Sequence, residues 1–91
     1  MGLLEIRGRV GHSVSLKDKR RVIQSILDRA RKRWNLSVSE VDYQDDRQWT
    51  RMAFVNVGSN RQMVERELQQ VLMLVEDHSE LEVYESDITF V

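Results

Sequence analysis

The sequence contains no cysteine and no proline, and only four of its 91 residues are glycine. The absence of cysteine excludes disulfide bonds and thiolate chemistry, and it favours a reducing compartment, which we expect to be the cytoplasm. Few glycines and no prolines favour dense secondary structure joined by short turns. No apolar run approaches the length of a membrane span. The N-terminus lacks the basic and apolar regions of a signal peptide.

Charge is abundant but unevenly distributed along the chain. Apolar residues make up 41% and charged residues 32% of the sequence, which is typical of a soluble globular domain rather than a disordered one. Residues 1–51 contain 12 bases and 7 acids, whereas residues 52–91 contain 2 bases and 8 acids. This asymmetry predicts a basic surface for an anionic partner and an acidic surface elsewhere.

The most basic segment is also the clearest helix, which we predict over residues 15–33. Ser15 is a suitable N-cap, and apolar residues follow at helical spacing. They form one stripe that another element must cover. The stripe consists of Leu16, Val22, Ile23, Ile26, Leu27 and Ala30.

Residues 16–33 contain eight bases and two acids. The bases near the start of this helix occupy the end where the helix dipole disfavours positive charge. This placement of positive charge is unfavourable for the helix and brings no evident structural gain. Positions of this kind are candidates for a function. Lys19 also falls on the apolar stripe, which leaves two interpretations of its side chain. Its stem either snorkels to solvent or lines an anion site at the helix start.

Four other segments are predicted to be strands: residues 3–10, 36–44, 49–58 and 80–91. The apolar phase of the second strand shifts between Val38 and Val41, which predicts a bulge or an edge position. A second helix is predicted over residues 61–77, capped by Ser59-Asn60, with Ser59 and Gln62 as a capping box. Residues 11–14 form the loop before the basic helix.

The predicted order is strand, helix, strand, strand, helix, strand. It predicts one ferredoxin-like α+β domain over residues 1–91, with a four-stranded antiparallel sheet and both helices on one face. The first and third strands are expected at the centre of the sheet. The opposite face of the sheet is expected to be open.

Three sequence blocks resemble the YlxP-like bacterial family, which is catalogued as a domain of unknown function. They are S-L-K-D-K-R-R-V-I-Q-S-I-L at positions 15–27, E-V-D-Y-Q-D at 40–45 and S-N at 59–60. The resemblance covers nearly the whole chain and implies a ferredoxin-like fold. It also implies a gene neighbourhood of translation initiation and ribosome maturation factors, and it implies no reaction.

One position departs from the family pattern. The family commonly carries an apolar residue and a tryptophan directly after Q-D, whereas this chain has Asp46 and Arg47 there, and Trp49 follows two residues later. A shift of two residues keeps a strand side chain on the same face of a sheet. Trp49 is therefore expected to fill the space that the family's usual tryptophan occupies.

The favoured function is binding of structured RNA or a ribonucleoprotein, such as a ribosomal particle, during ribosome maturation or translation, with phosphates contacting the basic helix. An RNA-recognition motif is rejected, because Met52 stands where an aromatic is required and the first strand supplies none. The competing reading is that the bases form an ordinary solvated helix face. The predicted contacts are Lys17, Lys19, Arg20 and Arg21, with Arg7 and Arg9 in support.

The alternative function is a protein-interaction module that uses the open sheet face. We expect Met52, Phe54 and Trp49 on that face, and such an exposed apolar surface favours an interface. We therefore expect a homodimer. No membrane contact or small-molecule substrate is expected.

Acidic residues cluster near the turn between the second and third strands. Strand alternation is expected to place Glu40 and Asp42 on one face, close to Asp45 and Asp46. Carboxylates that lie together can bind a hard cation or act as a general acid and base. No calcium-loop spacing, nucleophile elbow or glycine-rich phosphate loop is present. The acids are more simply explained as charges that deter edge pairing. We therefore expect no enzyme activity, no cofactor and no metal site.

Overall fold

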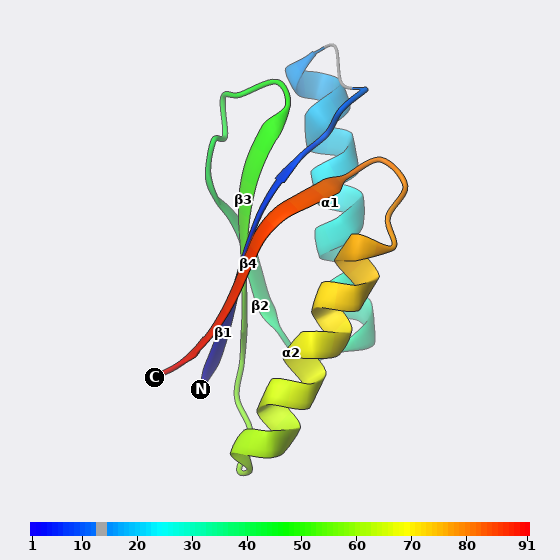
Figure 1. Ribbon diagram of the computed structural model, residues 1–91. Helices are drawn as coiled ribbons and strands as arrows, with labels where there is room; N and C mark the ends of the chain where they lie inside the picture. Colours follow the sequence, from blue (N-terminus) through cyan, green and yellow to red (C-terminus); the bar gives the residue numbers. More distant parts are fainter. Residues whose placement is uncertain (13–14) are drawn as a thin grey trace.

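A computed structural model of the chain describes residues 1–12 and 15–91 (Figure 1). Both helices cover one face of a four-stranded antiparallel sheet, in which the strand order is β2-β3-β1-β4. The predicted ferredoxin-like arrangement is confirmed, with the first and third strands at the centre. Residues 13 and 14 of the predicted loop lie outside the described residues. The elements are β1 (Gly2–Arg9), α1 (Leu16–Arg33), β2 (Ser37–Asp42), β3 (Trp49–Asn56), α2 (Arg61–Glu76) and β4 (Glu82–Phe90).

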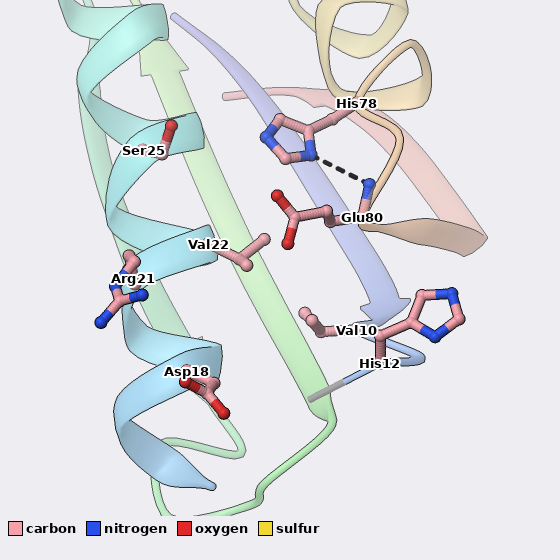
Figure 2. Close-up of a pocket in the computed structure, with 8 residues that line it drawn as sticks. All are labelled: Val10, His12, Asp18, Arg21, Val22, Ser25, His78 and Glu80. Atoms are coloured by element: carbon pink, nitrogen blue, oxygen red, sulfur yellow. Dashed lines mark hydrogen bonds between the residues drawn. The ribbon is translucent and has the colours of Figure 1, made fainter. Parts of the chain in front are cut away.

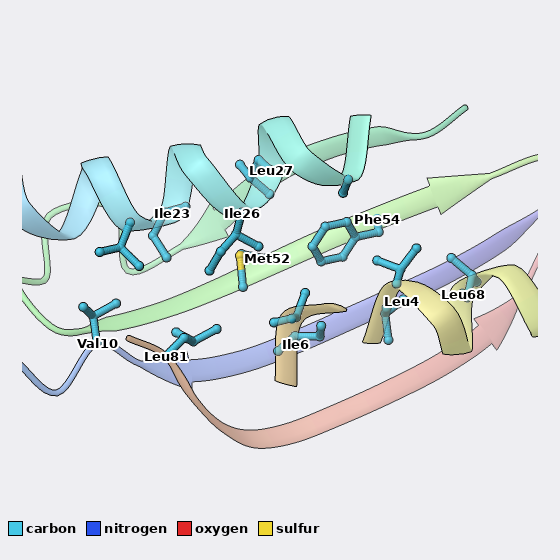
Figure 3. Packing of buried hydrophobic residues seen from close by; sticks show 14 of the residues in the cluster. Leu4, Ile6, Val10, Ile23, Ile26, Leu27, Met52, Phe54, Leu68 and Leu81 are labelled. Carbon is cyan, nitrogen blue, oxygen red and sulfur yellow. The ribbon is translucent and has the colours of Figure 1, made fainter. Parts of the chain in front are cut away.

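The hydrophobic core lies between the sheet and the two helices, and Figure 3 shows how its side chains meet there. In β1 every second side chain is buried, as the alternation predicts. In α1 the predicted stripe is buried from Val22 to Ala30. The stripe of α2 is buried at Val64, Leu68, Val71 and Val75. Within the described residues, no helix is both long and apolar enough to span a membrane.

The phase of β3 differs from the expectation. Met52 pairs with Ile6 and Phe54 pairs with Leu4, so both side chains point toward the helices. Both are fully buried. The expectation that they lie on the open face is therefore wrong, while Trp49 does lie there. The two faces of this strand are similarly apolar, so its sequence does not reveal which face is covered.

The predicted irregularity in β2 is confirmed. The strand lies at the edge of the sheet, and its pairing with β3 shifts between Glu40 and Asp42. Glu40 pairs with Met52, which faces the helices, and Asp42 pairs with Arg51, which faces away. The bulge therefore separates the two carboxylates onto opposite faces, so the expectation that they share a face is wrong.

Each helix has a side-chain cap at its start. The hydroxyl of Ser15 accepts from the backbone N–H of Asp18 at 3.2 Å, as predicted for α1. In α2 the cap is Asn60, whose side chain accepts from the N–H groups of Gln62 and Met63 at 2.8 and 3.3 Å. The predicted Ser59–Gln62 capping box is wrong, because Asn60 directly precedes the first helical residue and occupies the cap position.

Candidate nucleic-acid interface

The solvent side of α1 carries two groups of positive charge, one near each end of the helix, which together we call the basic face. Its seven bases are all exposed, whereas the two acids of the helix, Asp18 and Asp28, are only partly exposed. An 18-residue helix is about 27 Å long, so the charges are spread over a considerable distance. The basic face consists of Lys17, Arg20, Arg21, Arg29, Arg31, Lys32 and Arg33.

Few of these charges are neutralised by the rest of the protein. Arg31 pairs with Asp28 at 2.8 Å, and Arg20 lies 3.9 Å from the almost fully exposed Asp45. Exposed pairs of this kind contribute little binding energy and are easily exchanged for another anion. Within the described part of the chain, the other five bases form no ion pair.

Lys19 does not belong to the basic face, because its side chain is completely buried. Its ammonium donates to the Tyr43 carbonyl at 2.5 Å and forms an ion pair with Glu40 at 2.8 Å. The Thr50 hydroxyl donates to the same Glu40 oxygen at 2.5 Å. Both readings of Lys19, as a snorkelling side chain and as an anion ligand, are therefore wrong. Its charge is satisfied inside the protein.

Arg7 and Arg9 lie on the open face, on the opposite side of the sheet from α1. They alternate with buried residues of β1, so the expectation that they extend the surface of the basic helix is wrong. Arg7 donates to Glu85 at 2.7 Å, and this contact lowers the pKa of Glu85 and raises that of Arg7. Arg9 donates to the side-chain oxygen of Gln48 at 3.0 and 3.2 Å.

The open face carries an aromatic cluster around Arg7. The guanidinium of Arg7 lies 5.0 Å from the ring centre of Trp49 and 5.9 Å from that of Tyr84, and the two ring centres are 4.9 Å apart. Tyr84 stands where the β1–β4 register shifts, and sequence reasoning missed it because only the strand pairing reveals this shift. Trp49 is confirmed on this face, but in a setting of mixed charge. Glu5, Arg51, Glu85 and Asp87 line an adjacent hollow.

The acidic residues near the β2–β3 turn do not converge on a shared site. Asp46 accepts from the backbone N–H groups of Gln48 and Trp49 at 2.8 and 2.7 Å, and these bonds lower its pKa. Asp42 accepts from the N–H of Tyr43. Among residues 1–12 and 15–91, no group of three or more histidines and acids is placed to hold a metal ion.

A pocket of about 300 Å³ lies beside the first turns of α1 (Figure 2). It brings together His12, which precedes α1, and His78, which follows α2. His78 accepts from the backbone N–H of Glu80 at 3.3 Å. Figure 2 shows the Arg21 side chain directed away from both histidines. The pocket therefore combines opposite charges without a nucleophile and base in contact.

A larger groove of about 730 Å³ runs between α1 and α2. Arg29 and Arg33 of the basic face form its α1 side, and residues from the last turns of α2 form the other side. The α2 residues are Gln70, Met73 and Leu74, together with Asp77 at the end of the helix.

Comparisons with known proteins agree with this fold. Residues 1–88 match the family model described as "Protein of unknown function (DUF503)". The uncharacterized protein YlxP of Bacillus subtilis (strain 168) is 43% identical over 68 residues, which cover 75% of this chain and 74% of YlxP. The chain therefore belongs to the DUF503 family, as its sequence blocks indicate. The de novo designed protein Foldit4 shares the fold, with a TM-score of 0.62, 20% identity and coverage of 99% of this chain and 97% of the design.

Proposed function

We propose that this protein binds structured RNA through the basic face of α1. The observation that carries the proposal is the set of seven exposed bases, five of which have no ion-pair partner within the described residues. An RNA backbone supplies repeated negative charges that can contact both ends of this basic face. Exposed side chains on a regular helix recognise backbone shape better than base sequence.

The contact surface differs from the one expected from sequence. Lys17, Arg20 and Arg21 remain in it, and the bases of the second half of α1 extend it. Lys19 is removed because it is buried, and Arg7 and Arg9 are removed because they lie across the sheet. The proposed surface is thus one helix face rather than the junction of a helix and a strand.

The proposed partner is a ribosomal particle or a ribosomal RNA precursor in the cytoplasm. The gene neighbourhood implied by the family resemblance supports the ribosomal partner, and the absence of cysteine favours the reducing cytoplasm. The proposal contains no catalytic step and no cofactor. Binding through phosphate contacts should weaken strongly as salt increases, because counterions are released when the complex forms.

Charge reversal on α1 tests the proposal. The variant Lys17→Glu/Arg21→Glu should bind a structured RNA hairpin roughly tenfold or more weakly in fluorescence anisotropy, and its salt slope should fall by about two. The matched control is Arg61→Glu/Arg66→Glu, which changes the net charge equally at two exposed positions of α2. Equal weakening by both variants would mean that net charge, not the basic face, determines binding. Circular dichroism establishes that each variant is folded.

A second candidate function is a protein contact on the open face. The exposed cluster of Arg7, Trp49 and Tyr84 favours it, because aromatic residues and arginine are enriched at the centres of interfaces. A homodimer formed through this face remains part of this candidate. Tyr84→Ser tests it by sedimentation velocity, since Tyr84 is exposed and its replacement leaves the core intact. This candidate predicts that the variant loses self-association and keeps its affinity for RNA.

A further inference from the structure

The groove between α1 and α2 contains opposite charges that do not meet. Arg29 and Arg33 line one side and Asp77 lines the other. None of the three takes part in an ion pair within the described residues, so their charged atoms lie more than 4.0 Å apart. The groove, at about 730 Å³, separates a basic wall from an acidic one.

The α2 side of the groove is also partly apolar. Met73 is 61% exposed although it lines the groove, and Leu74 beside it is half-buried. A methionine side chain is flexible and polarisable, and it makes favourable contacts with aromatic rings. Gln70, on the same side, offers an amide that both donates and accepts hydrogen bonds. The groove thus combines a cationic wall, an apolar surface and a wall with hydrogen-bond acceptors.

A nucleotide has the complementary set of groups. Its phosphate suits the two arginines, the flat face of its base suits Met73, and N–H groups on the base edge suit Asp77, whose ionised carboxylate only accepts. Guanine presents two adjacent N–H donor groups on its pairing edge, more than the other bases. The carboxylates of an acidic peptide would be attracted by the two arginines but repelled by Asp77.

A base inside a regular RNA helix is stacked and paired, so it cannot enter this groove. We propose that the α1–α2 groove binds one unpaired guanine nucleotide of the RNA, with its phosphate on Arg29 and Arg33 and its base against Met73 and Asp77. This inference rests on the proposed function and makes it more specific. The preferred RNA is a helix with a bulged or looped-out guanine next to the phosphates that the basic face contacts.

The experiment compares three RNA hairpins by fluorescence anisotropy. They share one stem, which is fully paired, interrupted by a single bulged guanosine, or interrupted by a single bulged uridine. The wild type should bind the guanosine-bulged hairpin roughly fivefold or more tightly than the paired one. Met73→Ala should lose this preference while keeping its affinity for the paired hairpin. Asp77→Asn should reduce the discrimination between guanosine and uridine bulges.

Met63→Ala provides the matched control. Met63 lies on the same helix and is 64% exposed, close to the 61% of Met73, but it lies outside the groove. Met63→Ala should retain the full preference for the bulged hairpin. Equal effects of the two methionine variants would overturn the inference, because they would indicate a general property of the α2 surface. Both side chains are exposed, so neither substitution removes core packing.

The outcomes separate this inference from the proposed function. In one outcome the wild type binds all three hairpins with equal affinity, while Lys17→Glu/Arg21→Glu loses this binding. That result would overturn the groove assignment and leave RNA binding by α1 intact. Failure to bind any hairpin would overturn both. An acidic amphipathic peptide is titrated in the same assay. Peptide binding that depends on Met73, without any preference among hairpins, would assign the groove to a protein partner and overturn the inference.

Discussion

Replacement of Lys19 by methionine should destabilise the protein substantially. Methionine retains an unbranched apolar stem but removes the ammonium that pairs with Glu40. Among the described residues, Glu40 would keep the Thr50 hydroxyl as its side-chain partner, and the Tyr43 carbonyl would keep the Asp46 backbone N–H, at 3.0 Å, but lose the Lys19 ammonium. Removing one partner of a buried ion pair costs about 3–5 kcal/mol. The Glu40 side chain is 14% exposed, so water relieves part of this cost, and we expect about 3 kcal/mol.

Urea unfolding monitored by circular dichroism measures this loss, and a double-mutant cycle identifies its cause. Lys19→Met/Glu40→Gln removes both charges, so its loss of stability should be smaller than the sum of the two single losses, with a coupling energy of about 2 kcal/mol. Lys17→Met, at an exposed position two residues earlier, should change the unfolding free energy by about 0.5 kcal/mol or less. A Lys19→Met protein within about 1 kcal/mol of wild type, or additive effects in the double mutant, would refute the reasoning.

Two further predictions concern a glycine of β1 and an acid of the β2–β3 turn. A Cβ on Gly8 would lie 2.8 Å from the backbone carbonyl of Glu82, so Gly8→Ala should cost about 1–3 kcal/mol in urea unfolding. Gly11→Ala, whose nearest contact would be 3.5 Å away, should cost much less, and equal costs would contradict the account. Asp46 has a lowered pKa because two backbone N–H groups bond to its charged form, so its contribution to stability is present above about pH 4 and is lost as the pH falls through the folded-state pKa. The unfolding free energy of Asp46→Asn should therefore fall less steeply than that of wild type below about pH 4, and parallel pH profiles would count against this role.

The fold was predictable because its periodic patterns agree with one another. The alternation in β1 and the apolar stripe of α1 each define a single buried face, and the element order then leaves few topologies. The phase of β3 was not predictable from its own residues. Met52 and Phe54 alternate with Ala53 and Val55, and only the pairing with β1 shows which set faces the helices.

The candidate site was predicted less well because its charged residues depend on distant partners. The exposed bases of α1 follow from helical spacing alone. The burial of Lys19 requires an acid 21 positions later, in an edge strand where Glu40 pairs with the inward-facing Met52 just before the bulge. Two signals did point to this pair: a lysine on an apolar stripe, and a phase shift next to Glu40. Neither signal alone identifies a partner.

The most direct test of the central claim is cosedimentation of the tagged protein with ribosomal particles from its own cells, at low and moderate salt. The account predicts that the wild type sediments with one subunit or precursor at low salt and less so at moderate salt, because phosphate contacts by α1 weaken as counterions compete. Lys17→Glu/Arg21→Glu should remain unbound at both concentrations. Migration of the wild type only as a free small protein at both salt concentrations would contradict the account.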